Sequence, residues 1–164
     1  HQLTFRPSDK VTLNSSSFIG NDFPDEERKM RYFHNLYGQL QISNQFALIA
    51  GFDIGAQQKE KASDDYDTWY TPVLIAKYSP TEKVNIAARG EYYQDKNGVI
   101  INSGTENGFQ TFGASINVDY QILPNLVWRT EVKSLNSKDA IFLNRDDNMK
   151  KDNVMAVTSL AIRF

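Results

Sequence analysis

The sequence predicts an all-β fold, in which an antiparallel up-and-down sheet of about eight strands forms a transmembrane β-barrel or part of a larger one. Three observations lead to this prediction. Apolar and polar residues alternate along most of the chain, and short connections alternate strictly with long ones. The longest apolar run, at 46–52, is far shorter than the roughly 18 residues of a membrane helix. We expect one domain, 1–164, or the C-terminal segment of one.

Composition supports strands and excludes several functions. The chain has 10 Phe and 8 Tyr in 164 residues, and aromatic side chains favour strands. It has no Cys, which excludes a disulfide scaffold, a thiolate metal site and a cysteine nucleophile. The net charge of −2 gives no basic surface for nucleic acid.

The breaks between apolar runs define the strands. Short breaks rich in Pro, Asn or Ser lie at 6–10, 43–45, 79–83 and 123–125. Long hydrophilic connections lie at 21–29, 59–65, 95–108 and 136–152. The expected strands are 11–20, 31–42, 46–57, 67–78, 84–94, 109–122, 126–135 and 153–164. Residues 1–5 are typical of the end of an earlier strand, and the short turns predict an antiparallel meander.

Each strand has one apolar face. Strand 46–57 places Phe46, Leu48, Ala50, Phe52 and Ile54 on one side, and strand 109–122 repeats this pattern at its own even-numbered positions. We therefore expect even-numbered residues to face outward from residue 31 onward. In strand 11–20 the apolar residues have odd numbers instead, so there the predicted outward side chains are Val11, Leu13 and Ile19.

Aromatic residues of the apolar face gather near strand ends, which predicts two girdles at the boundaries of a membrane. The girdle near the long loops comprises Tyr32, Tyr70, Tyr92 and Phe112. The girdle near the short turns comprises Phe46, Tyr78, Tyr120, Trp128 and Phe164. A soluble β-sandwich or lipocalin-like barrel is the alternative, and the two girdles and the terminal Phe164 argue against it.

The opposite face carries charges, which need water or mutual pairing. The candidate pore-lining residues are Arg31, Asp53, Lys77, Arg89, Glu91, Asp119, Arg129, Glu131, Lys133 and Arg163. The short turn at 123–125 would place Asp119 opposite Arg129 and Asn117 opposite Glu131. Such residues would either line water in a wide barrel or fill a narrow one. Tyr37 is expected to cover Gly51 on this face.

Two segments of the C-terminal half and the final strand carry a family resemblance. Residues 82–100, 107–142 and 158–164 resemble the OmpL-like β-barrel porin family of bacterial outer membranes, most specifically at Arg89, Glu91 and Tyr92 and at Trp128, Arg129 and Glu131. The resemblance runs from about residue 67 to 164 and is looser before it. It implies the C-terminal part of a wider barrel, in which the charged face would line water, and a terminal Phe recognised during membrane insertion.

The resemblance implies a passive outer-membrane channel for small hydrophilic solutes, with no cofactor. The expected partners are outer-membrane lipid, these solutes and other outer-membrane proteins that dock to the barrel, but no nucleic acid. A structural or interaction barrel in a larger outer-membrane assembly is the alternative, and a barrel-embedded enzyme a weaker one. Charges of both signs in the lumen indicate no strong preference for either ion.

Catalytic and metal sites find little support, and we expect none. His1 and His34 are the only histidines, and no catalytic motif surrounds either one. Asp64, Asp65 and Asp67 are read as a solvated loop in preference to catalytic acids or a calcium site.

The connections and ends of the chain carry three further expectations. We expect the long connections to be extracellular and the short turns periplasmic. Ile141 and Phe142 lie in a charged loop, which either folds inward to narrow the pore or packs against a neighbouring loop. Because open sheet edges are costly in lipid, strand 153–164 is expected to pair with an upstream strand outside this sequence.

Overall fold

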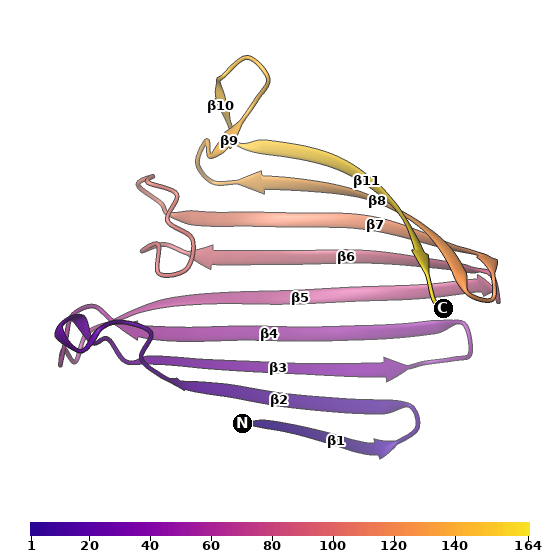
Figure 1. Cartoon of the computed structure of the whole chain (residues 1–164), viewed down its shortest axis with the longest axis horizontal. Helices are drawn as coiled ribbons and strands as arrows, with labels where there is room; N and C mark the ends of the chain where they lie inside the picture. The colour runs from indigo at the N-terminus through magenta and orange to yellow at the C-terminus, as the bar shows by residue number, and fades with distance from the viewer.

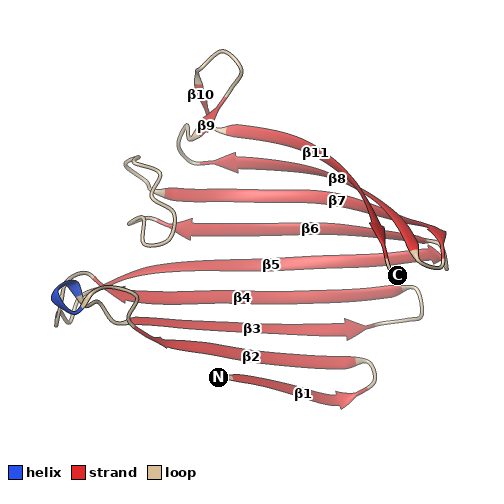
Figure 2. Ribbon diagram, in the orientation of Figure 1, coloured by secondary structure: helices blue, strands red, loops and turns tan.

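A single antiparallel sheet of nine strands forms the body of the protein (Figures 1 and 2). The computed structural model describes residues 1–164. Neighbours in the sheet follow the order of the chain, β1-β2-β3-β4-β5-β6-β7-β8-β11, and a separate two-stranded hairpin pairs β9 with β10. The topology is therefore up-and-down throughout, as the sequence predicts.

The strand bounds lie close to those expected. The sheet contains β1 (Gln2–Ser8), β2 (Val11–Gly20), β3 (Arg31–Gln41), β4 (Phe46–Gln58), β5 (Tyr66–Thr81), β6 (Val84–Asp95), β7 (Phe109–Leu123), β8 (Leu126–Ser137) and β11 (Asp152–Ile162). The hairpin contains β9 (Phe142–Leu143) and β10 (Met149–Lys150). The only helical element is the 3-10 turn η1 (Asp25–Glu27), and no helix could cross a membrane.

Two elements differ from the sequence prediction. Residues 2–8 form a full edge strand, so nine strands, and not eight, belong to the sheet. The long connection 138–151 contains the β9-β10 hairpin, which the sequence did not indicate because each strand has only two residues. Such short pairings leave no detectable alternation in the sequence.

The connections divide the sheet into two ends (Figure 1). The turns after β1, β3, β5 and β7 lie at one end, which we call the turn end, and the connections after β2, β4, β6 and β8 lie at the other, the loop end. Both edge strands, β1 and β11, run toward the turn end. Of the 103 backbone hydrogen bonds, 84 lie within the regular elements. The strand ladders therefore satisfy most main-chain N–H and C=O groups of the sheet without a second layer.

The faces of this sheet reverse the usual arrangement of a soluble protein. Trp69 is the only buried hydrophobic side chain, whereas the buried polar or charged ones number six: Asn14, Gln57, Asp95, Thr111, Ser115 and Ser137. In β7 the odd-numbered residues from 111 to 115 are buried, while Phe112 and Ile116 between and beside them are exposed. The covered face is polar and the open face is apolar.

Charge follows the same division. Within β3 to β8, every Asp, Glu, Lys and Arg has an odd number. Apart from the pairs Thr81–Val84 and Leu123–Leu126 beside two short turns, the register pairs odd with odd between neighbouring strands of this set and into β11. Asp119 thus lies opposite Arg129, and Glu131 opposite Val157. We call the side of the sheet with the odd-numbered residues of β3 to β8 and β11 the polar face. The side with their even-numbered residues is the apolar face.

The predicted change of parity in the second strand is confirmed. The β2-β3 register pairs Leu13 with Gly38 and Ile19 with Tyr32, so odd-numbered residues of β2 share the apolar face with even-numbered residues of β3. Leu3 and Phe5 of β1 continue this face, since Phe5 lies opposite Leu13. Both are exposed, as are Leu13 and Ile19.

Candidate functional site

The polar face holds all ten residues that the sequence proposes as pore lining. They come from β3 (Arg31), β4 (Asp53), β5 (Lys77), β6 (Arg89, Glu91), β7 (Asp119), β8 (Arg129, Glu131, Lys133) and the residue after β11 (Arg163). The strands bring them together because residues two apart on one strand and directly opposed on the next share a face. That they line a water-filled space stays a prediction.

Asp119 and Arg129 form the best-defined ion pair of this face. They are opposed in the β7-β8 register, as expected from the short turn, and Asn117 is opposed to Glu131. Arg129 donates from Nε and Nη2 to the two carboxylate oxygens of Asp119 at 2.7 and 2.6 Å. Asn117 donates a third hydrogen bond to this carboxylate at 2.8 Å. A bidentate guanidinium contact of this kind is among the stronger charged pairs.

Glu91 lies between two cations. Its carboxylate pairs with Arg89 on the same strand and, at 2.5 Å, with the ammonium of Lys133 two strands away. Gly113 lies opposite Glu91 in the ladder, and a Cβ there would come within 2.8 Å of the carboxylate. The absence of a side chain at residue 113 therefore lets Glu91 lie close to the sheet, beneath its partners.

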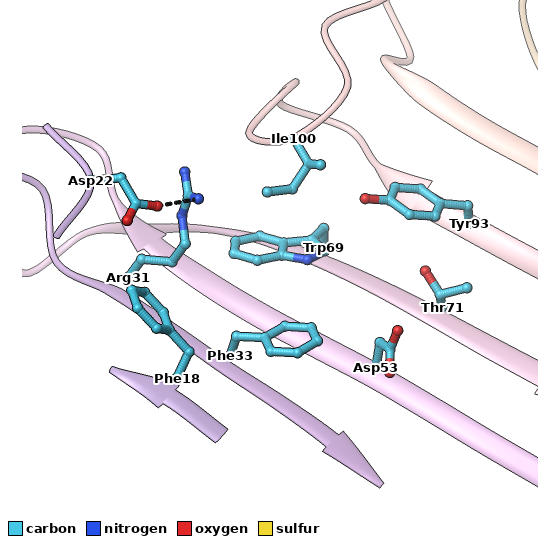
Figure 3. Close-up of a pocket in the computed structure, with 9 residues that line it drawn as sticks. All are labelled: Phe18, Asp22, Arg31, Phe33, Asp53, Trp69, Thr71, Tyr93 and Ile100. Atoms are coloured by element: carbon cyan, nitrogen blue, oxygen red, sulfur yellow. Dashed lines mark hydrogen bonds and ion pairs between the residues drawn. The ribbon is translucent and has the colours of Figure 1, made fainter. Parts of the chain in front are cut away.

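An aromatic cluster that the sequence reasoning missed occupies the polar face at the loop end (Figure 3). The indole of Trp69 lies on Gly55, its cross-strand partner, and only 4% of the residue is exposed. The guanidinium of Arg31 lies 5.9 Å from the centre of the Trp69 ring system and pairs with Asp22 at 2.7 Å. The Arg31 guanidinium also donates two hydrogen bonds to the side chain of Gln57.

A cavity of about 410 Å³ opens beside this cluster. Its lining combines aromatic and charged side chains, namely Phe18, Asp22, Arg31, Phe33, Asp53, Trp69, Thr71, Tyr93 and Ile100 (Figure 3). The aromatic members of β3 to β6 could have been found from the sequence, because Phe33, Trp69 and Tyr93 have odd numbers and so belong to the polar side of their strands. The sequence predicts that Tyr37 covers Gly51, but Val73 lies closer: a Cβ at residue 51 would be 2.9 Å from Cγ1 of Val73 and 3.5 Å from Cβ of Tyr37.

Asp95 fastens the loop of residues 96–108 onto the polar face. Its carboxylate is fully buried and accepts hydrogen bonds from the backbone N–H groups of Val99, Ile100 and Ile101 at 2.7–2.9 Å. Gly98 has a φ of +66°, which allows the tight turn back toward the carboxylate. As a result Ile100 lines the cavity next to Trp69, and Ile101 lies near Phe109 and Leu135 on the same face.

The loop over the polar face is therefore 96–108. For the segment that contains Ile141 and Phe142, the structure shows a contact with a neighbouring loop: Asp139 accepts hydrogen bonds from the backbone and the side-chain amide of Asn107, both at 2.9 Å. These bonds hold the pKa of Asp139 below its usual range. Figure 1 shows the β9-β10 hairpin of this segment extending away from the sheet.

The proposed girdle residues all have even numbers and lie on the apolar face or, for Phe164, just past β11. The register opposes Tyr92 to Phe112 at the loop end, and Phe46 to Tyr78 and Tyr120 to Trp128 at the turn end. Ring centres are 6.2 Å apart for Tyr70 and Tyr92, and 6.0 Å apart for Phe46 and Tyr78. Tyr32 lies near Tyr66, and Phe164 is exposed. Both groups thus form rows across neighbouring strands.

The structure places His34 and the three aspartates on different elements. His34 lies on the apolar side of β3, where its Nδ1 is 2.7 Å from the hydroxyl of Ser17. Asp64 and Asp65 belong to the β4-β5 connection, as expected. Asp67, expected in the same loop, belongs instead to β5, because the strand begins at Tyr66, and it contacts Asn97 and Lys59. No group of three or more metal-ligating side chains occurs in the structure.

A large up-and-down sheet with one continuous apolar face, one charged face and alternating short and long connections is typical of membrane β-barrel proteins as a class. The family comparison gives the particular group. The chain belongs to the family described as putative beta-barrel porin-2, OmpL-like, whose model matches residues 1–164. The family thus covers the N-terminal third as well, where the sequence resemblance is looser. No curated protein and no solved structure matches the chain.

We expect Gly55→Ala to lower the free energy of unfolding by about 1–3 kcal/mol, because the added methyl group would overlap the Trp69 ring. Gly90→Ala is the matched control, since a Cβ at residue 90 meets open space. Denaturant titration of the folded protein in detergent measures both. Equal losses would show that the contact between Gly55 and Trp69 does not constrain the sheet.

Asp95→Ala should release the loop 96–108, because three backbone N–H groups lose their acceptor. A loss of about 2 kcal/mol would raise the open population roughly 30-fold. Trypsin cleavage after the exposed Lys96 reports that population. Glu106→Ala, which removes an exposed carboxylate from the same loop, should leave the cleavage rate unchanged. Equal cleavage of both variants would contradict the role of Asp95.

Proposed function

We propose that this protein forms a passive channel for small hydrophilic solutes in the bacterial outer membrane. The observation that carries the proposal is the reversal of the two faces, since a polar, covered face and an exposed apolar face suit a sheet with water inside and lipid outside. Membership of a family of β-barrel porins supports it.

In this proposal the apolar face contacts lipid and the two aromatic rows lie at the membrane boundaries. From Tyr70 to Tyr78 is eight residues, about 26 Å at ~3.3 Å per residue and less when the strand is tilted. That length suits the apolar band of an outer-membrane barrel, about 25 Å tall. The even-numbered residues between them, Pro72, Leu74 and Ala76, carry no charge.

The orientation follows from the connections. Outer-membrane barrels have short periplasmic turns and longer extracellular loops. We therefore place the turn end in the periplasm and the loop end outside the cell. The cavity beside Trp69 and the loop 96–108 then lie toward the extracellular entrance, where solutes first meet the polar face.

The ion pairs of the polar face would line water. Solvation lowers the cost of charges on a wall, and pairing in the ladder lowers it further. Arg89, Glu91 and Lys133 form one group, and Asp119 and Arg129 another, so the lining consists of linked charges on adjacent strands. The solute path would therefore be defined by the local electric field and by the width of the passage.

Conductance tests the proposed function directly. We expect the intact protein, purified from its membrane and added to planar lipid bilayers in KCl, to open discrete ion-conducting channels. A detergent blank and a heat-denatured sample are the controls. A folded protein that inserts but conducts no ions would contradict the channel and favour a structural or docking barrel.

Leu74→Lys and Ile75→Lys test which face meets lipid. Leu74 is on the apolar face and Ile75, its neighbour, on the polar face of β5. A lysine facing the middle of the bilayer costs about 2–4 kcal/mol, so Leu74→Lys should lower the free energy of unfolding in lipid vesicles by that amount and Ile75→Lys by much less. A larger loss for Ile75→Lys would reverse the assignment of the faces.

A further inference from the structure

We infer that the channel prefers anionic solutes, because in each ion pair at the middle of the polar face the cation is more exposed than the carboxylate that it contacts. This inference rests on the proposed function and goes beyond it, since the residue types alone indicate no strong preference for either sign. It concerns small solutes with carboxylate or phosphate groups, which share the negative charge and the oxygen acceptors that guanidinium and ammonium groups bind.

The ion pairs in the middle of the sheet all have the same polarity. Arg89 exposes 44% of its side chain and its partner Glu91 only 14%. Arg129 exposes 55% and its partner Asp119 only 18%. Lys133, the second partner of Glu91, exposes 27%. In each pair the positive group is therefore the one that a solute would approach first.

All the remaining candidate lining charges of this face except Arg31 follow the same order. Lys77 and Arg163 are exposed, whereas Asp53 and Glu131 are half-buried. Asp53 accepts a hydrogen bond from the amide of Asn35 at 2.5 Å. The strands place two further carboxylates on this face near the loop end. Asp95 is fully buried beneath the loop 96–108, and Asp67 lies between Asn97 and Lys59.

Side-chain length and local space explain this arrangement. An Arg or Lys side chain reaches further from the backbone than Asp or Glu, so its charge extends over a neighbouring carboxylate. Glu91 lies close to the sheet because Gly113 beside it has no side chain. Each ion pair is then a dipole with its positive end toward the solute. In a passage with low-dielectric walls such a field concentrates anions.

One pair departs from this order and lies outside the middle of the sheet. At the loop end Asp22, in the β2-β3 connection, exposes 51% of its side chain and Arg31 only 20%. The chain as a whole has a net charge of −2, so the inferred preference depends on the placement of charges along the polar face and not on the total.

Reversal potentials measure the preference. The intact protein in planar bilayers, with a KCl gradient across the membrane, should pass chloride at least about twice as readily as potassium. The preference should decrease as the mean KCl concentration rises from 0.1 to 1 M, because the screening length falls from about 10 to 3 Å. This salt dependence needs no variant.

Arg89→Ala combined with Arg129→Ala should move the ratio toward potassium, because both substitutions also uncover a carboxylate. Arg89→Lys with Arg129→Lys should retain the chloride preference, and Arg145→Ala in the β9-β10 hairpin removes an arginine away from the polar face and should change nothing. An unchanged far-ultraviolet circular dichroism spectrum of a variant in detergent shows that it has folded.

The outcomes separate the inference from the proposed function. Channels that pass potassium as readily as chloride, or more readily, would overturn the anion preference and leave the channel intact. A chloride preference that persists in the double alanine variant would overturn its assignment to Arg89 and Arg129. Absence of any channel would overturn the proposed function and the inference with it.

Discussion

Alternation of side chains across the antiparallel ladders is the constraint on which the rest of this structure depends. The sheet is a single layer, and hydrogen bonds between neighbouring strands satisfy most of its main-chain groups. With neither a second sheet nor a helix packed against it, each face must meet its own environment. A one-residue shift of register would exchange the charged and apolar residues of a strand, so the two environments also fix the register.

Glycines on the polar face have a role that this constraint explains. Gly55 makes room for the indole of Trp69, and Gly113 makes room for the carboxylate of Glu91. Large or charged side chains can then lie along the sheet instead of standing upright on it. The polar face is consequently layered, with carboxylates and the indole next to the backbone and cations above them.

The local part of this architecture could be predicted from the sequence, and the non-local part could not. Strand bounds, the change of parity in β2 and the opposition of Asp119 and Arg129 all follow from a period of two and a short turn. The hydrogen bonds that the Asp95 carboxylate accepts from the loop 96–108 depend on how this loop turns back on its own strand, and the periodicity of the sequence does not indicate that turn. The packing of Trp69 on Gly55 could not be predicted either, although the odd number of Trp69 indicated the face on which it lies.

The common direction of the two edge strands limits the ways in which this sheet can close into a ring. Because β1 and β11 both run toward the turn end, joining them directly would create one parallel pair in an otherwise antiparallel sheet. A ring in which all neighbours are antiparallel has an even number of strands. Such a ring would need an odd number of further strands between β11 and β1, and every solution of this kind widens the circumference beyond nine strands.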